Sequence, residues 1–166
     1  MATRCNVILK DSKNDSKVYL YRHWDGYPGE TGADLIKHLV PALDAKNGQR
    51  GFRAMLTSLV NAKRGGEGRD HDQPQYEVTD AIHGDIEHLY ELSFNAGRAN
   101  GHTSVLITHS MRRCGDKDFG GKVHLSLEQF VGMVNADRTA MNKRLAELRA
   151  SSKHYADCAD YPMLTA

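Results

Sequence analysis

The sequence predicts an α+β domain, in which a mainly antiparallel sheet of about five strands is accompanied by three helices in the order ββ-αα-βββ-α. Three observations predict this class. Short segments with alternating apolar residues are separated by turn-forming residues in both halves of the chain. Three other segments repeat apolar residues at helical spacing. Strands and helices do not alternate one by one, which would instead favour a parallel sheet.

The first two predicted strands form a hairpin. Residues 3–9 place Cys5, Val7 and Leu9 on one side of an extended segment. Residues 17–23 are again extended and rich in aromatic and branched side chains. The polar stretch between them has the composition of a loop, so the two strands are predicted to pair antiparallel.

The first predicted helix follows Gly32. Its apolar residues lie on one face, at Leu35, Ile36, Leu39, Val40 and Leu43. Thr31 is the expected N-cap, with Asp34 three residues later. Because proline inside a helix removes a backbone donor and crowds the preceding turn, Pro41 is expected to kink or end the helix near residues 38–40.

The second predicted helix carries its apolar face on Phe52, Met55, Leu56, Leu59 and Val60. It is expected to stop at Gly65, because glycine readily adopts the left-handed conformation that ends helices. Both helices are expected to lie on the same face of the sheet.

The second half of the chain is predicted to add three strands, centred on residues 76–82, 89–92 and 104–108. The sequences His83-Gly84 and Asn100-Gly101 suit the positive-φ positions of tight hairpin turns. These strands are therefore expected to follow one another as hairpins.

The third predicted helix opens with a capping box between Ser126 and Gln129. Its core stripe is Leu127, Phe130, Val131, Val134, Met141, Leu145 and Leu148. The residues after Ser151 look like a loose tail. The sequence thus predicts a single domain over residues 1–151 and a C-terminal tail over 152–166.

Composition places the chain among ordinary globular proteins. At 166 residues it is long enough for one domain that buries roughly 70% of its unfolded surface. Hydrophobic residues make up 40% and charged residues 26%, which excludes a mostly disordered chain. The net charge is +1, so no overall field attracts nucleic acid or an anionic membrane, and neither partner is expected.

We expect a cytoplasmic protein. No apolar run approaches the ~20 residues needed to cross a bilayer. Residues 1–10 lack the apolar core of a secretory signal. Cys5, Cys114 and Cys158 are far apart and form no Cys-x-x-Cys pair, which indicates neither a disulfide framework nor a zinc knuckle. A reducing compartment follows from this cysteine pattern.

One segment departs from what a fold alone requires, and it reads Tyr21-Arg22-His23-Trp24-Asp25-Gly26-Tyr27-Pro28. Trp24 is the only tryptophan, and aromatic rings offer flat surfaces on which bases stack. Arg22 and His23 can donate hydrogen bonds to phosphate. Residues 29–32 then lead into the free N–H groups of a helix N-terminus, where anions bind. The segment is the first candidate ligand-binding site.

The alternative is a purely structural strand-to-helix turn. In that case Asp25 bonds turn amides, Trp24 lies in the core and His23 is structural. Glu30 and Asp34 also weigh against an anion, because they already place carboxylates at the positive end of the helix.

A second candidate segment, His83-Gly84-Asp85-Ile86-Glu87, is expected to face the first across one cleft. His83, Asp85 and Glu87, together with His23 and Asp25, offer the nitrogen and oxygen donors of a metal site. The predicted turn breaks the alternation that would align them, and their spacing matches no strong metal signature. No metal and no cofactor are therefore predicted. The alternative is that the carboxylates belong to the turn and the solvent.

Loop arginines could form the rim of a site for a phosphorylated ligand, or they could be solvated charges. The candidate ligand-binding residues are Tyr21, Arg22, His23, Trp24, Asp25, Tyr27, His83, Asp85, Glu87, Arg112 and Arg113. Nucleotide-binding glycine fingerprints and the Gly-x-Ser-x-Gly elbow are absent, so no catalytic residue is assigned.

The segment over residues 21–28, with the following Gly32, resembles the hallmark of a family of small phage and bacterial proteins. The opening Thr3-Arg4-Cys5-Asn6 and residues 83–90 resemble two further stretches of that family. The resemblance covers residues 1–45 and 76–92. It leads us to expect tyrosine where His88 stands, which argues against His88 as a catalytic group. The resemblance implies phage kinship, and therefore a bacterial host, but no particular chemistry.

Three classes of function follow. The first is a phage-related binding protein that sequesters a small nucleotide-like or phosphorylated signalling ligand and so counters a host defence. The second is a phosphodiester hydrolase that uses His23 or His83 as general acid or base, with a neighbouring carboxylate or a metal. The third is a protein–protein interaction module that inhibits a host enzyme. Turnover and homo-oligomerisation stay open.

Overall fold

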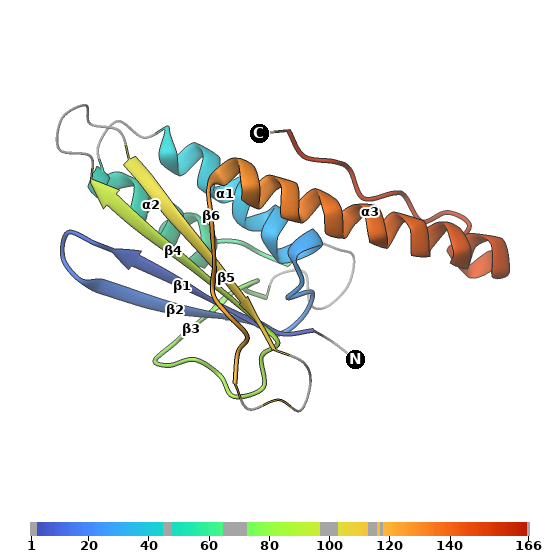
Figure 1. Cartoon of the computed structure of the whole chain (residues 1–166), viewed down its shortest axis with the longest axis horizontal. Coiled ribbons are helices and arrows are strands. Elements are labelled where there is room, and N and C mark those ends of the chain that lie inside the picture. Colours follow the sequence, from blue (N-terminus) through green and yellow to red (C-terminus); the bar gives the residue numbers. More distant parts are fainter. Residues whose placement is uncertain are drawn as a thin grey trace.

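The computed structural model describes residues 3–44, 48–64, 73–96, 103–112, 116 and 118–165. Over these residues the chain forms a six-stranded sheet and three α-helices, so the predicted α+β class is confirmed (Figure 1). The strands are β1 (Cys5–Asp11), β2 (Ser16–Arg22), β3 (Glu77–Thr79), β4 (His88–Ala96), β5 (Thr103–Met111) and β6 (Val123–Leu125). The helices are α1 (Ala33–Leu43), α2 (Gly48–Val60) and α3 (Leu127–Ser151), with a π-helical turn η1 (Pro28–Gly32) and a 3₁₀ turn η2 (Lys153–Tyr155).

The strand order is β3-β2-β1-β4-β5-β6. β1 and β2 form the predicted antiparallel hairpin, and the pairs β2–β3, β4–β5 and β5–β6 are antiparallel too. The prediction of five antiparallel strands is wrong in two respects. A sixth strand, β6, extends the sheet, and β1 runs parallel to β4, with Cys5 opposite His88. Two helices and β3 separate β2 from β4, and a crossover of that length allows a parallel pair.

The hairpin predicted at His83-Gly84 is wrong. β3 pairs with β2 at the edge of the sheet, whereas β4 pairs with β1 in its middle. Residues 80–87 therefore cross between these strands, and the Glu87 N–H donates to the Arg4 carbonyl at 3.0 Å. Strand pairing between distant segments decides this path, and a local turn signal does not report it. β4 and β5 pair antiparallel as predicted, and their Asn100-Gly101 turn lies outside the described residues.

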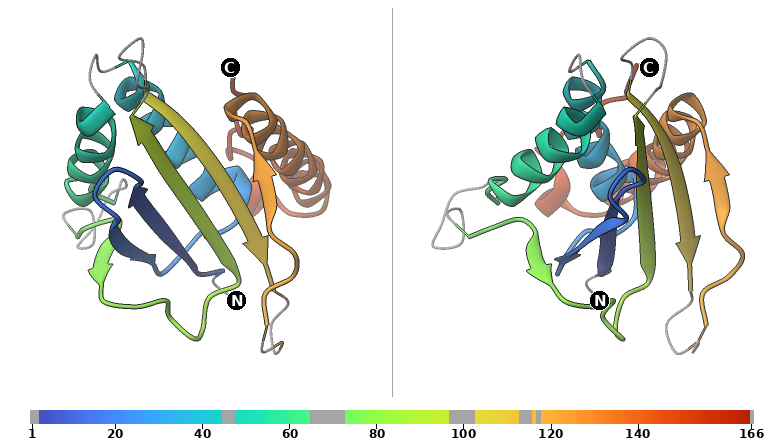
Figure 2. Two further views of the ribbon diagram at one scale, coloured as in Figure 1. Left: turned by 60° about the vertical axis from the view of Figure 1, so that its left-hand side comes forward. Right: turned by 90° about the vertical axis from the view of Figure 1, so that its left-hand side faces the viewer.

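All three helices cover one face of the sheet, whereas no described helix covers the other (Figure 2). We call these the helix face and the open face. The main core lies on the helix face and includes Val7, Leu9, Leu20, Leu35, Leu39, Met55, Leu59, Tyr90, Leu92, Phe94, Phe130 and Val134. A smaller cluster of Ile8, Tyr21, Ile86 and Leu89 lies on the open face. The helix face therefore supplies most of the apolar burial that stabilises the fold.

The first two helices differ from the prediction at their ends. Thr31 is not an N-cap but lies within η1, where its hydroxyl donates to the Asp25 carbonyl at 2.6 Å. α1 does not end near residues 38–40, because it continues through Pro41 to Leu43. α2 buries Phe52, Met55 and Leu59 of its predicted face, whereas Val60, also predicted there, is exposed. The helix ends at Val60, and Gly65 lies outside the described residues.

The capping box of Ser126 and Gln129 is present at the start of α3. The first half of α3 is buried at Phe130, Val131 and Val134, and its second half extends past the sheet (Figure 1). Residues 152–165 are not a loose tail, since they fold back along α3 and are hydrogen-bonded to it. None of the described helices is both long enough and apolar enough to traverse a bilayer.

Candidate functional site

Alternation along β2 divides the 21–28 segment between the two faces of the sheet. Tyr21 lies on the open face, opposite Asn6, and Arg22 lies on the helix face, opposite Cys5. The chain then leaves the sheet through Asp25, whose φ of 56° is in the left-handed region. Adjacent residues of one motif thus enter different environments.

Gly26 explains why this turn fits closely against β1. A Cβ atom there would lie 2.6 Å from the Arg4 carbonyl carbon. The Gly26 N–H donates to the Thr3 carbonyl at 2.9 Å, and the Tyr90 hydroxyl donates to the Gly26 carbonyl at 2.8 Å. This glycine is required by close backbone approach, which fixes the end of β2 beside β1.

We define the Tyr21 cluster as Arg4, Tyr21, His23, Trp24, His83 and Asp85. The His83 ring stacks on the Tyr21 ring with centroids 4.0 Å apart and an interplanar angle of 16°. The His23 ring meets the same ring edge-on at 4.5 Å. The Tyr21 hydroxyl donates to the Asp85 carboxylate at 3.2 Å, and Arg4 bonds that carboxylate at 2.5 Å. Two histidines, a carboxylate and a guanidinium therefore surround one phenol ring.

Trp24 extends the cluster at the end of β2. Its side chain is exposed, with a relative accessibility of 43%, and its ring lies 5.3 Å from the His23 ring. The Arg64 guanidinium lies over the indole, with Cζ 3.4 Å from the ring centroid. His23 Nε2 lies 3.2 Å from a Glu77 carboxylate oxygen. An exposed aromatic ring beside a cation is a favourable surface for stacking.

The backbone around residues 83–87 is held in place by two side chains, Asn6 and Arg112. The His83 N–H donates to the Asn6 side-chain oxygen at 2.8 Å. Arg112 donates to the carbonyls of Gly84 and Ile86. Since Asn6 is fully buried, His83 and Asp85 are presented from a fixed backbone.

The charges of the Tyr21 cluster face solvent. The side chains of Arg4 and Asp85 are 44% and 47% exposed, so their ion pair adds little stability. Burial, and then the Asp85 carboxylate, raises the pKa of Tyr21. Tyr21 therefore stays a neutral phenol that donates to Asp85. A ligand can replace this ion pair at small cost because water already reaches both groups.

On the helix face, Arg22 belongs to a buried assembly that we call the Arg22 network: Arg22, Asp34, His38, Ser58 and Tyr76. The Tyr76 hydroxyl donates to Asp34 at 2.7 Å and accepts from Arg22 at 3.2 Å. Asp34 lies 3.4 Å from Arg22 and 3.6 Å from His38 Nε2. His38 Nδ1 lies 2.6 Å from the Ser58 hydroxyl.

These contacts keep Asp34 ionised. Burial alone would raise the pKa of Asp34, but hydrogen bonds from His38 and Tyr76 and the charge of Arg22 lower it overall. The network joins β2, α1, α2 and the segment before β3, and we assign it to folding. Sequence reasoning missed it, although the i, i+4 spacing of Asp34 and His38 was a usable signal.

Tyr27 and Asp25 occupy a third environment. Burial, then the charges of Asp25 and Glu30 and a hydrogen bond with Tyr161, raise the pKa of Tyr27. Arg138 donates to the Gly29 carbonyl at 2.8 Å in the same region. Tyr27 therefore connects the turn to the C-terminal tail, and Gly29 connects η1 to α3.

A pair of histidines on the neighbouring strands β4 and β5 was also missed by the sequence reasoning. His88 Nδ1 and His109 Nε2 lie 3.0 Å apart, and the two rings stack with centroids 5.3 Å apart. Burial, and then His109, lowers the pKa of His88 to about 4. Burial likewise lowers the pKa of His109. Only the register of β4 and β5 brings the two residues together.

The predicted site residues are thus brought together in part. One cluster contains Tyr21, His23, Trp24, His83 and Asp85. Arg112 donates hydrogen bonds to the backbone carbonyls of Gly84 and Ile86 beside it. Arg22 points to the opposite face, whereas Asp25 and Tyr27 lie in the turn toward α3. Glu87 contributes its backbone to Arg4 and Arg112, and Arg113 lies outside the described residues. Arg4 belongs to the cluster and Arg64 lies over Trp24, and neither was among the predicted ligand-binding residues.

The described residues contain no group of three or more histidine, cysteine, aspartate or glutamate side chains placed to hold a metal ion. Asp85 instead contacts Arg4 and Tyr21, and His23 contacts Glu77. The arrangement therefore offers stacking surfaces, imidazoles and guanidinium donors.

Comparisons of the chain with protein-family models, with curated proteins and with solved structures find no match.

Proposed function

We propose that the chain is a small binding protein for a nucleotide-like ligand, which the Tyr21 cluster and Arg64 bind. The observation that carries the proposal is the exposed indole of Trp24, with the Arg64 guanidinium over one face and the His23 ring beside it. Stacking of a base on such a ring contributes ~1–3 kcal/mol. Stacking tolerates different bases because every base has a π-face.

The same cluster offers donors for a phosphate. Arg4 and Arg64 are the guanidinium groups beside the rings, and guanidinium–phosphate hydrogen bonds are among the stronger ones in proteins. Without ligand, Arg4 is paired with Asp85 in an exposed ion pair. A phosphate would take the place of that carboxylate, so binding should weaken as ionic strength rises.

The biological role proposed here is sequestration of a signalling nucleotide by a phage-related protein, in the cytoplasm of a bacterial host. It rests on the resemblance of residues 21–28 and 83–90 to phage proteins and on the composition of the cluster. Such a protein binds its ligand tightly and releases it chemically unchanged.

A thermal-shift screen with adenosine and guanosine monophosphates, dinucleotides and cyclic nucleotides tests this proposal. At a hundredfold excess over Kd, a ligand should stabilise the native state by about 2.7 kcal/mol. Chromatography of the ligand recovered after denaturation should return the compound that was added. The absence of a shift with every nucleotide would contradict the proposal and favour the protein-interaction module.

Phosphodiester hydrolysis is the second candidate function. Its supporting observation is that both His23 and His83 contact the Tyr21 ring, one at its edge and one on its face. Two imidazoles that contact the same phenol ring could serve as general acid and base on one phosphodiester. Recovery of a cleaved product in the same screen, lost in both His23→Gln and His83→Gln, would select hydrolysis over sequestration.

A further inference from the structure

The C-terminal tail is bound by α3 in the manner of a peptide ligand. The Asn135 side chain donates to the Leu164 carbonyl and accepts from the Leu164 N–H, both at 2.8 Å. The Asn142 side chain does the same with Tyr161, at 3.0 and 2.7 Å. Each asparagine amide therefore satisfies both backbone groups of one tail residue, as a neighbouring β-strand would.

The two asparagines are spaced to match an extended chain. Seven residues of α-helix separate Asn135 from Asn142, which is about 10.5 Å along the axis. Three residues of extended backbone between Tyr161 and Leu164 span about 10 Å. Arg138 lies between the asparagines and donates to the Pro162 carbonyl. Three side chains on one face of α3 thus contact the backbone of an antiparallel segment.

These contacts depend on the backbone of the bound segment more than on its side chains. The carbonyl of Cys158 accepts from Arg149 in the same way, and the side chain of Asp160 accepts from Arg149 at 2.8 Å. Side-chain selectivity enters through Tyr161, which is hydrogen-bonded to Tyr27, and through Leu164, which packs against the main core. The site on α3 therefore favours an extended segment with an aromatic hydroxyl three residues before its last contact.

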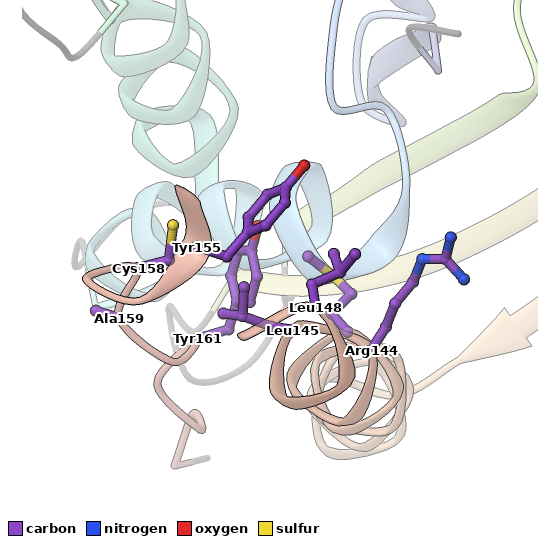
Figure 3. A pocket seen from close by; sticks show the side chains of 8 residues that line it. Arg144, Leu145, Leu148, Tyr155, Cys158, Ala159 and Tyr161 are labelled. Atoms are coloured by element: carbon purple, nitrogen blue, oxygen red, sulfur yellow. The ribbon is translucent and has the colours of Figure 1, made fainter. Parts of the chain in front are cut away.

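The tail leaves part of this site open. A cavity of about 340 Å³ lies between the second half of α3 and the tail (Figure 3). Its lining is Met141, Arg144, Leu145, Leu148, Tyr155, Cys158, Ala159 and Tyr161. The tail and α3 are joined by the short turn η2, whose backbone bonds are local to residues 152–158. Opening this turn would release the tail and leave the strands of the sheet paired, with loss of the contact between Leu164 and the main core.

We propose that α3 carries a peptide-binding site that recognises an extended backbone, and that the tail of a second copy of this chain can occupy it in place of the chain's own tail. The same four backbone bonds from Asn135 and Asn142 form in either case, so exchange loses none of these contacts. A tethered tail has an effective concentration near the millimolar range, so the free chain at micromolar concentration stays mainly closed. Binding of the second copy's tail becomes dominant when the chain's own tail cannot bind to α3.

The first test offers the tail as a separate peptide to an opened chain. The opened chain is full length and carries Tyr161→Pro and Leu164→Pro, which remove the two tail N–H donors and leave α3 unchanged. The probe is a fluorescein-labelled peptide of residues 157–165 with Cys158→Ser, followed by anisotropy. We expect saturable binding, weakened about tenfold or more by Asn135→Asp or Asn142→Asp, since each change replaces one hydrogen bond by repulsion.

Lys143→Ala is the matched control, because this exposed side chain neighbours Asn142 on α3. It should leave peptide affinity within twofold, and circular dichroism should show that every variant retains the helical content of the unaltered chain. The absence of peptide binding to a folded opened chain would overturn the proposal. So would binding that is insensitive to both asparagines.

The second test identifies the second copy as the occupant. The opened chain has a working site and no working tail, whereas a chain with Asn135→Asp and Asn142→Asp has a working tail and no working site. Native mass spectrometry should detect a heterodimer in their mixture and no homodimer of either chain alone. Peptide binding without any heterodimer would overturn the assignment to a second copy.

Discussion

The Tyr21 cluster and the Arg22 network begin at neighbouring residues of β2 and use the same kinds of side chain: arginine, aspartate, tyrosine and histidine. In the cluster, Arg4 and Asp85 are 44% and 47% exposed, and Trp24 projects into solvent. In the network, Arg22 and Asp34 are only 10% and 16% exposed, and Tyr76 bridges them. Burial therefore decides which group stabilises the fold and which is free to meet a ligand.

This difference has an energetic basis. A buried ion pair contributes little net stability, but loss of one partner strands the other charge in a medium of low dielectric constant. An exposed pair is screened by water and salt, and either partner can be removed or redirected at small cost. Matched substitutions should therefore lower the free energy of unfolding far more in the network than in the cluster.

The largest expected effect separates Asp34 from Asp85. Asp34→Ala leaves the buried Arg22 charge without its carboxylate partner and the Tyr76 hydroxyl without its acceptor, and it should lower the free energy of unfolding by about 3–5 kcal/mol. Asp85→Ala removes an exposed carboxylate and should lower it by less than ~1 kcal/mol. Urea denaturation of both variants measures the difference. Equal losses would contradict the assignment of separate roles.

The buried histidines sharpen the comparison through pH. Folded His88 has a pKa of about 4, against 6.5 in the unfolded chain, so the unfolded state binds a proton first as the pH falls. The free energy of unfolding should therefore drop between pH 6.5 and pH 4, by ~3 kcal/mol from this group. His109, whose pKa burial also lowers, acts in the same direction.

His88→Tyr is the matched variant, since it retains an aromatic ring and does not titrate in this range. Denaturation curves at pH 7, 5.5 and 4 should show a smaller acid loss for His88→Tyr than for the unaltered chain. Parallel pH profiles for the two proteins would mean that His88 is not buried as a neutral imidazole.

Two tyrosines provide a smaller contrast. Tyr76→Phe removes a buried hydroxyl that both donates and accepts, and it should cost about 1–3 kcal/mol of stability. Tyr21→Phe removes a donor to the exposed Asp85, which can turn to water, and it should cost less than ~1 kcal/mol. Thermal denaturation of the two single variants compares them directly, and a larger loss for Tyr21→Phe would reverse the roles that we assign.

The smallest expected effect on stability belongs to Trp24. A core tryptophan replaced by alanine costs ~3–5 kcal/mol. Because Trp24 is exposed, Trp24→Ala should change the free energy of unfolding by no more than ~0.5 kcal/mol. Urea denaturation without ligand measures this change. A decrease of ~3–5 kcal/mol in the free energy of unfolding would mean that Trp24 is a structural residue.

Local patterns in the sequence predicted the elements that depend on local chemistry. The β1–β2 hairpin, the capping box at Ser126 and the first half of the apolar face of α3 follow from residue alternation or helical spacing. The second half of that face, at Met141, Leu145 and Leu148, was wrongly placed in the core, since it lines the cavity beside the tail. The parallel pairing of β1 with β4 and the path of residues 80–87 did not follow, because strand partners far apart in the sequence determine them. Thr31 was misread as a cap because η1 inserts a π-helical turn before α1.

In the candidate site, too, the local sequence predicted some residues, whereas others are placed there only by the fold. The aromatic residues of the 21–28 segment were identified from their composition, and His83 and Asp85 were expected beside them. The period-two alternation of β2 already implied that Tyr21 and Arg22 point to opposite faces, so the inclusion of Arg22 among the ligand residues could have been avoided. The fold places Arg4 in the cluster and Arg64 over Trp24, although neither was among the predicted ligand-binding residues.

The C-terminal tail was also misjudged. The residues after Ser151 were expected to form a loose segment. The contacts that hold the tail are to its backbone, which composition does not report. The seven-residue spacing of Asn135 and Asn142 was the available signal.

The fluorescence of Trp24 tests the central claim most directly, because it is the only tryptophan in the chain. A nucleotide that raises the melting temperature should quench this fluorescence, and both effects should saturate at the same Kd. Trp24→Ala should abolish most of the thermal shift, while His124→Ala, on the open face but outside the cluster, should keep it. A stabilising nucleotide that leaves the Trp24 fluorescence unchanged and still protects Trp24→Ala would contradict the account.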